Sequence, residues 1–278
     1  MILAIILLIS ASILSEVAGS IGKVAIGRKM ETAFSMSFLN MLWAFGIFGA
    51  TLLVRPDAWH FSLASIPLLL IRFVLECLQV YWSGEAVALA SRGTFGLVRS
   101  LTIPFVLLAD ILLGYTLDAY QLLGIGIVFL TLVVLASIGD LERKGIGFVL
   151  LSAVNAAITI SIFKFSITHY NSIPTEQFLI TGGLLTFVYI MARRDGEYPL
   201  RLFRQPMLAG QSAAFGTGSL LAALAYQWLP ASIATTFSRA LDVIWSIVFG
   251  KAYFKEAHLA TKLIGCAIIV VGLVLLAR

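Results

Sequence analysis

Ten apolar runs, separated by short connections, dominate this chain. An α-helix rises about 1.5 Å per residue, so roughly 20 apolar residues cross the ~30 Å hydrocarbon core of a bilayer. We predict membrane spans over 3–22, 33–54, 63–82, 94–114, 120–138, 147–167, 177–192, 207–227, 233–250 and 261–277. No connection is long enough for a soluble domain. The sequence therefore predicts an all-α integral membrane protein with ten transmembrane helices.

The composition excludes several other classes of protein. Of the 278 residues, 60% are hydrophobic and 12% are charged, whereas soluble domains carry roughly 25% charged residues. So few charges rule out a soluble enzyme, a disordered chain and a nucleic-acid-binding module. The formal net charge of +5 is typical of basic cytoplasmic loops in a membrane protein.

The loops that follow spans 1, 3, 5, 7 and 9 hold most of the basic residues outside the spans. These are Lys23, Arg28, Lys29, Arg92, Arg143, Lys144, Arg193, Arg194, Arg201, Arg204, Lys251 and Lys255. The opposite loops and the C-terminus hold only Arg55 and Arg278. Because basic loops stay in the cytoplasm, we predict a multi-pass protein of the plasma (bacterial inner) membrane. Both termini would then lie outside the cytoplasm.

The cysteines and histidines indicate no metal site and no cofactor. Cys77 and Cys266 both lie inside apolar runs and give neither a disulfide framework nor a metal-ligand spacing. The three histidines, His60, His169 and His258, lie at or near the ends of apolar runs. That placement argues against a zinc site within the membrane.

The two halves of the chain are similar to each other at a constant offset of 141 residues. Matching residues include Lys23 with Lys164, Ala90-Ser91 with Ala231-Ser232, Thr94 with Thr235 and Gly124 with Gly265. We therefore predict two repeats, 1–140 and 141–278. Each repeat holds five spans, an odd number, so the second would enter the membrane from the other side. Two inverted five-helix repeats are typical of alternating-access carriers, whose substrate site lies near the membrane midplane.

One stretch of each half resembles a known transporter family. The first runs from Glu85-Ala86-Val87-Ala88-Leu89-Ala90-Ser91 through Pro104 to Gln121-Leu122-Leu123-Gly124. The second runs from Leu229-Pro230-Ala231-Ser232 through Glu256 to Gly265. Both are similar to the EamA-type domain of the drug/metabolite transporter superfamily. Two positions depart from its pattern, where Tyr115 replaces a glutamate and Ile244 or Trp245 replaces a proline. The resemblance implies a cavity lined by helices 1–4 and 6–9, with helices 5 and 10 peripheral.

Charged residues inside the spans are the first candidates for binding. Arg99 in span 4 and Arg239 in span 9 lie within one residue of equivalence under the repeat. A guanidinium there suits a carboxylate or a phosphate, which it can grip with two hydrogen bonds. Asp242 lies one turn from Arg239 and offers a local ion pair as the alternative. A charge within the bilayer is costly without a partner or a water-filled cavity.

Glu16 lies well inside span 1, and a carboxylate in a low-dielectric site can exchange protons near neutrality. Together with Lys23, it also resembles the first helix of the small multidrug resistance branch. Glu16 is therefore a candidate for proton coupling or for binding a cation, and an interhelical salt bridge is the alternative. For Lys23 and its equivalent Lys164 we predict a structural role, reaching the lipid headgroups at helix ends.

Other polar residues of the spans have weaker assignments. Arg72 and Glu76, one turn apart, are expected to pair with each other. We also predict a set of residues that line the substrate cavity: Tyr81, Trp82, Asp110 and Asn155. The two aromatic residues could instead belong to an interfacial belt.

The leading hypothesis is a secondary transporter that moves a small metabolite, such as an amino acid or organic anion, by alternating access. No nucleotide-binding motif is present, so a proton gradient or substrate exchange would drive transport. The first alternative is a proton-coupled exporter of cationic drugs or quaternary amines. A distant alternative is an aspartyl-type intramembrane enzyme using Asp110 and Asp242. We predict no enzymatic activity and no nucleic-acid partner, and the sequence leaves a homodimer open.

Overall fold

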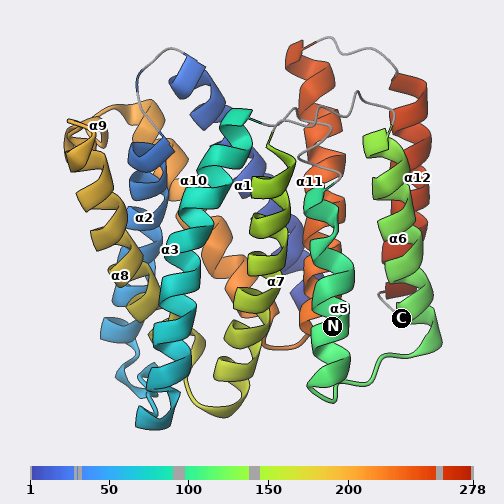
Figure 1. The fold of residues 1–278 in the computed structure, drawn as a ribbon, viewed down its shortest axis with the longest axis horizontal. Helices are drawn as coiled ribbons and strands as arrows, with labels where there is room; N and C mark the ends of the chain where they lie inside the picture. Colours follow the sequence, from blue (N-terminus) through green and yellow to red (C-terminus); the bar gives the residue numbers. More distant parts are fainter. Residues whose placement is uncertain are drawn as a thin grey trace. The chain divides into compact units, whose positions relative to one another are not determined.

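The computed structural model describes residues 2–27, 30, 33–89, 98–137, 145–254 and 259–276. Every regular element in this part of the chain is a helix (Figure 1). The α-helices are α1 (Ile2–Gly27), α2 (Ala33–Val54), α3 (Ile66–Leu89), α5 (Thr102–Leu112), α6 (Ala119–Ser137), α7 (Ile146–His169), α8 (Ile173–Arg194), α9 (Pro199–Leu202), α10 (Pro206–Ala225), α11 (Ala231–Phe254) and α12 (Leu259–Leu276). Two short 3-10 turns, η1 (Pro56–Ala58) and η2 (Leu63–Ser65), precede α3.

Several sequence assignments lie outside the described residues. They comprise residues 90–97 of the EamA-like stretch, Glu256, and the basic residues Arg28, Lys29, Arg92, Arg143, Lys144, Lys255 and Arg278.

Six helices of the described part are long and apolar enough to cross a membrane: α1, α2, α3, α7, α8 and α10. The chain is thus a helical protein with several candidate membrane spans, as the apolar runs predict. This finding concerns the described residues, and the count of ten spans remains a prediction from the sequence.

By its internal contacts the chain forms two compact units. The first unit comprises Met1–Ile9, Leu78–Ser161 and Trp228–Arg278, and the second comprises Ser10–Cys77 and Ile162–Gln227. Each unit combines segments from both halves of the sequence. These units describe packing, whereas the predicted repeats 1–140 and 141–278 describe similarity between sequences.

In the second unit, α2 and α8 pack antiparallel (Figure 1). The ring of Phe45 stacks on that of Phe178 with centroids 4.7 Å apart, and Phe38 lies 5.6 Å from Tyr189. As residue numbers rise along α2, their contacts move back toward the start of α8. Glycine makes this close approach feasible, since a Cβ on Gly182 would lie 2.9 Å from the ring of Phe45.

In the first unit, α6 and α12 lie side by side (Figure 1, green and red). A Cβ added to Gly124 would lie 2.7 Å from the carbonyl oxygen of Gly272 and 2.9 Å from the side chain of Leu276. A Cβ added to Gly265 would lie 2.6 Å from Leu135. The two helices therefore run antiparallel. Close packing between them accounts for the glycines at these positions, since small residues let helices approach closely in membranes.

Two of these contacts are related by the sequence repeat. Gly124 and Gly265 are equivalent at an offset of 141 residues, and so are Leu135 and Leu276. In the structure Gly124 faces Leu276, and Gly265 faces Leu135. The two contacts thus exchange under the 141-residue offset.

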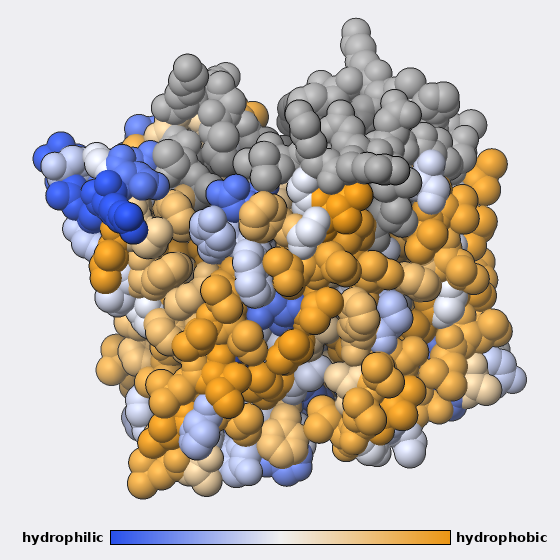
Figure 2. Space-filling model, viewed as in Figure 1, coloured by the Kyte–Doolittle hydropathy of each residue, from blue (hydrophilic) through white to orange (hydrophobic). Residues whose placement is uncertain are grey.

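The described surface is rich in large apolar side chains, as the broad apolar area in Figure 2 shows. Leu53, Leu63 and Leu112 are 84%, 75% and 77% exposed. Soluble monomers rarely expose large contiguous apolar patches. Lipid tails would cover these side chains, so the exposed surface agrees with the membrane character of the helices.

Lys164 differs from its prediction. The lysine is buried within the second unit rather than extended toward headgroups, and its Nζ donates a hydrogen bond to the carbonyl oxygen of Tyr226 at 2.5 Å. Tyr226 is the residue at which α10 ends. The last carbonyls of a helix lack partners within the helix and attract cations. Lys164 therefore has a structural role, as a charge at the end of α10.

Candidate functional site

The candidate site lies in the first unit, at the charged residues of α11 and of the helical turn that precedes α5. Arg239 lies near the middle of α11, and Asp242 lies one turn further along the same helix. Arg99 is half-buried in the helical residues 98–100, and its charge is within electrostatic range of Arg239 and Asp242. All three residues were singled out from the sequence.

Arg239 has few polar contacts for a charged side chain in this position. Its Nη1 lies 3.6 Å from Asp242 Oδ2, with 19% of the Arg239 side chain and 45% of the Asp242 side chain exposed. Its Nε is buried and donates no hydrogen bond to the described part of the chain. The Nε of Arg72 is buried without a hydrogen bond in the described chain as well, so this atom does not set Arg239 apart. A guanidinium can grip a carboxylate or phosphate through pairs of N–H groups, and at Arg239 the described chain gives the Nη groups one ion pair of 3.6 Å.

Two arginines close together favour the binding of negative charge. Their like charges repel each other, and the single carboxylate of Asp242 offsets part of that repulsion. An anion placed between the guanidinium groups would interact favourably with both. Arginine suits this role better than lysine, because its planar group stays charged and offers several donors in fixed directions.

The start of α11 is fixed by Asp110 of α5. Asp110 Oδ2 accepts a hydrogen bond from the backbone N–H of Ser232 at 2.7 Å, and both residues are fully buried. The first N–H groups of a helix have no partner within the helix, and its N-terminus attracts negative charge. Asp110, expected from the sequence to line the cavity, thus caps the helix that carries Arg239.

Asn155 belongs to a separate polar cluster between α3 and α7. Its Nδ2 donates to Gln79 Oε1 at 2.8 Å, and Gln79 Nε2 donates to Ser152 Oγ at 2.7 Å and to Ser83 Oγ at 2.9 Å. Four polar side chains in mutual contact satisfy one another within an apolar unit.

Tyr81 and Trp82 lie on α3 beside the cluster that contains Asn155. Tyr81 is 47% exposed and Trp82 is half-buried. For Tyr81 the exposure agrees with the belt alternative as well as with a cavity lining.

In the second unit, Glu16 is half-buried on α1 and accepts a hydrogen bond from Ser20 Oγ at 3.5 Å. At that length the bond is weak. The carboxylate thus lies within a candidate membrane span, as the sequence predicts.

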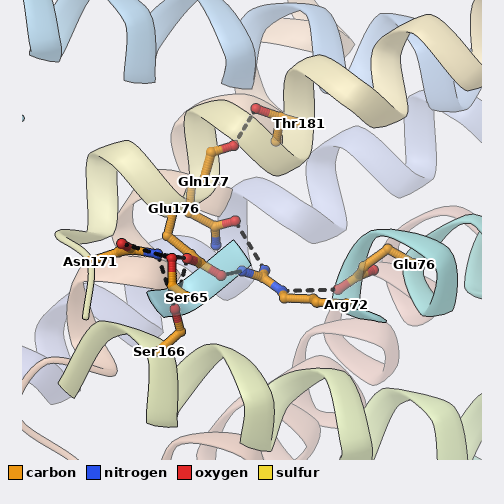
Figure 3. Close-up of polar contacts among 8 residues, drawn as sticks. All are labelled: Ser65, Arg72, Glu76, Ser166, Asn171, Glu176, Gln177 and Thr181. Carbon is orange, nitrogen blue, oxygen red and sulfur yellow. Dashed lines mark hydrogen bonds and ion pairs between the residues drawn. The ribbon is translucent and has the colours of Figure 1, made fainter. Parts of the chain in front are cut away.

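The sequence analysis missed the most extensive polar network of the described residues (Figure 3). Glu176, fully buried in the first turn of α8, accepts hydrogen bonds from Arg72 Nη1 at 2.9 Å, Ser166 Oγ at 2.8 Å and Asn171 Nδ2 at 2.6 Å. Asn171 also bonds Ser65. The network joins α3, α7, α8 and the turn before α3.

The expected ion pair between Arg72 and Glu76 is therefore only one of several contacts that Arg72 makes. Arg72 Nε lies 3.8 Å from Glu76, a longer contact than the one to Glu176. Arg72 Nη2 also donates to Gln177 Oε1 at 3.2 Å, and the guanidinium lies 4.6 Å from the ring centre of Phe163. Buried charges that are paired and hydrogen-bonded in this way are typical of a structural tie between helices.

The described residues contain no group of three or more histidine, cysteine, aspartate or glutamate side chains that could hold a metal ion.

Comparisons with known proteins support the fold and leave the family open. No family model and no curated protein matches the chain. A solved structure named "Crystal structure of protein" is similar over 99% of this chain and 98% of that chain, with a TM-score of 0.75 and 17% sequence identity. At this identity the likeness shows a shared fold alone.

Proposed function

We propose that this protein is a secondary transporter that moves a small anionic metabolite, such as an organic acid or an amino acid, across the membrane by alternating access. One observation carries the proposal. Arg239 lies on α11 within electrostatic range of Arg99, and within the described residues its guanidinium has a single ion pair, of 3.6 Å, to Asp242. Retaining such a charge in an apolar protein has a cost that binding of an anion would justify.

The packing of equivalent helices supports the alternating-access part of the proposal. The contacts Gly124–Leu276 and Gly265–Leu135 exchange under the 141-residue offset, and α6 and α12 run antiparallel. These are the contacts expected of two inverted copies related by a two-fold axis in the membrane plane. In such carriers each copy can adopt the conformation of the other, which opens the site to one side at a time.

The remaining features of the proposal follow from the sequence. We place ten spans in the plasma membrane with both termini outside the cytoplasm, on the basis of the apolar runs and basic loops. The similarity to EamA-type transporters supports the same architecture. Transport would use substrate exchange or a proton gradient, with Glu16 as the proton-carrying group.

Uptake into proteoliposomes tests the proposal. The purified protein would be assayed with radiolabelled lactate, malate, glutamate and inorganic phosphate, and with choline and tetraethylammonium as cations. We expect uptake of at least one anion and a fall of about 30-fold or more in Arg239→Gln, since a lost charge-pair contact costs about 2 kcal/mol or more. Arg99→Gln should act in the same direction.

Arg55→Gln is the matched control, because Arg55 is an exposed arginine of a loop. The control should transport as the wild type does. Thermal unfolding in detergent shows whether each variant is folded. Uptake of cations alone, or full anion uptake by folded Arg239→Gln, would contradict the anionic substrate.

Glu16 supports a proton-coupled exporter of cationic drugs as the alternative, because a half-buried carboxylate on α1 suits a cation. The cations in the same panel decide between the two. In the alternative, Glu16→Gln abolishes their proton-driven transport and Arg239→Gln does not.

An aspartyl-type enzyme is a weaker hypothesis. Asp110 contacts the N-terminus of α11, and Asp242 contacts Arg239. An aspartyl dyad instead needs its two carboxyl groups to share a proton.

A further inference from the structure

Asp242 forms an ion pair with Arg239 within a single helix. The two residues are three positions apart on α11, so a movement of other helices leaves their spacing unchanged. Their atoms are 3.6 Å apart, which is longer than a hydrogen bond of about 2.7–3.2 Å. The contact is therefore an ion pair without a hydrogen bond, and it is weak enough to be replaced.

The side chain of Asp242 is more exposed than that of Arg239. Asp242 is 45% exposed and Arg239 is 19% exposed. The carboxylate thus lies on the more accessible side of the pair, where an entering anion would compete with it. The ion pair involves Nη1 of Arg239, so the anion would compete with Asp242 at the Nη end of the guanidinium.

We propose that Asp242 is a built-in counter-anion that occupies Arg239 when the site is empty and that the substrate's anionic group displaces. This inference rests on the proposed function and specifies how the same site releases its substrate. A carboxylate or phosphate that reaches both Nη groups makes two charged hydrogen bonds, which are stronger than the ion pair it replaces. Return of Asp242 then helps the anion to leave.

A second consequence concerns the empty transporter. Without a substrate, Asp242 offsets part of the repulsion between Arg239 and Arg99, which are within electrostatic range of each other. The aspartate thus lowers the cost of the empty site while limiting the affinity for the substrate. Removing its charge should tighten anion binding and slow release, because the competing group is gone.

Transport kinetics of Asp242 variants test this role. Asp242→Asn and Asp242→Ser both remove the charge, and Asp242→Glu keeps it; Asp57→Asn, at an exposed aspartate in η1, is the control. The probes are lactate, malate, glutamate and inorganic phosphate in proteoliposomes. For the anions transported by the wild type, we expect the two neutral variants to lower KM about three- to tenfold, as loss of a competing ion pair predicts.

The same variants should lower kcat, because a more tightly held anion leaves more slowly. Asp242→Glu should restore KM and kcat toward the wild-type values, and Asp57→Asn should match the wild type. A merely structural role would lower kcat and thermal stability without lowering KM. An unchanged or raised KM in the folded neutral variants would overturn the inference.

The two hypotheses fail in different ways. If Arg239→Gln abolishes anion uptake while KM is unchanged in the neutral Asp242 variants, only the counter-anion role fails. If Arg239→Gln transports anions as the wild type does, the anion site itself is wrong. If only Asp242→Asn fails to fold, Asp242→Ser supplies the same comparison.

Discussion

The two arginine sites differ in how completely their hydrogen-bonding groups are used. In the second unit, Arg72 is 4% exposed and bonds Glu176 at 2.9 Å and Gln177 at 3.2 Å. In the first unit, Arg239 is 19% exposed and has one ion pair, at 3.6 Å, among the described residues. The Nε of each arginine is buried without a hydrogen bond in the described chain, so the two sites differ at their Nη groups. Nη groups bonded to buried acceptors tie helices together, whereas we propose that those of Arg239 bind an anion.

The largest effect should come from breaking the satisfied network. Glu176→Ala leaves the guanidinium of Arg72 buried beside fewer acceptors. We expect the free energy of unfolding to fall by about 3–5 kcal/mol, measured by thermal or denaturant unfolding in detergent micelles. Glu76→Ala is the control, because its 3.8 Å contact should contribute about 1 kcal/mol or less. Equal losses in the two variants would refute the assignment of Glu176 as the main partner.

The helix cap should give an intermediate effect. Asp110→Ala removes the acceptor of the buried Ser232 N–H, and the lost cap should cost about 1–2 kcal/mol. Hydrogen–deuterium exchange should rise in the first turn of α11 and stay unchanged in α8. Because α11 carries Arg239, uptake should also fall. Unchanged exchange at the start of α11 would show that Asp110 does not hold this helix.

The comparison of the two arginines predicts that replacing Arg239 lowers the stability of the protein less than replacing Arg72. Arg239→Leu removes a charge whose only described ion pair is 3.6 Å long, so stability should change by about 1 kcal/mol or less. Arg72→Leu should instead destabilise the protein strongly, since it leaves Glu176 buried without its cation. Thermal unfolding of both variants measures the contrast. A large loss of stability in Arg239→Leu would assign that residue a structural role.

The smallest effect is a titration of Tyr198, an exposed residue that follows α8. A hydrogen bond from Arg193 and its positive charge lower the pKa of Tyr198 below the usual value of 10.0. The Arg193 guanidinium lies 3.8 Å from the centre of the Tyr198 ring. Because the cation favours tyrosinate, Arg193→Gln should raise this pKa. The difference in ultraviolet absorbance between the wild type and Tyr198→Phe isolates the group, and an unchanged midpoint in Arg193→Gln would contradict the assignment.

Most helices could be predicted from the sequence, because a run of apolar residues long enough for a bilayer is a local property. The prediction 33–54 coincides with α2, Ala33–Val54, and 147–167 lies within α7, Ile146–His169. The predicted span 177–192 begins four residues after the observed start of α8, Ile173–Arg194. The start of α8 is polar, where Ser172 caps the helix by accepting from Thr175 N–H. Glu176 was left outside the span for the same reason.

The candidate site was predicted in part. Arg99, Arg239 and Asp242 were identified because charges inside apolar runs are conspicuous, and the i, i+3 spacing indicated the ion pair that is observed. The cap formed by Asp110 was not foreseen, since its partner is 122 residues away. Spacing along one helix can be read from a sequence, but contacts between helices depend on how those helices pack.

The sequence by itself determined the helical membrane character, the approximate limits of the helices and the charges that they carry. Bilayer thickness and helix rise act on consecutive residues, so these properties need no knowledge of the rest of the chain. The tertiary structure alone decided which charges are satisfied. Arg72 and Glu176 meet across 104 positions of sequence, while the described ion pair of Arg239 is to its neighbour on α11. Long-range packing thus separates an arginine that ties helices together from one whose described ion pair lies within its own helix.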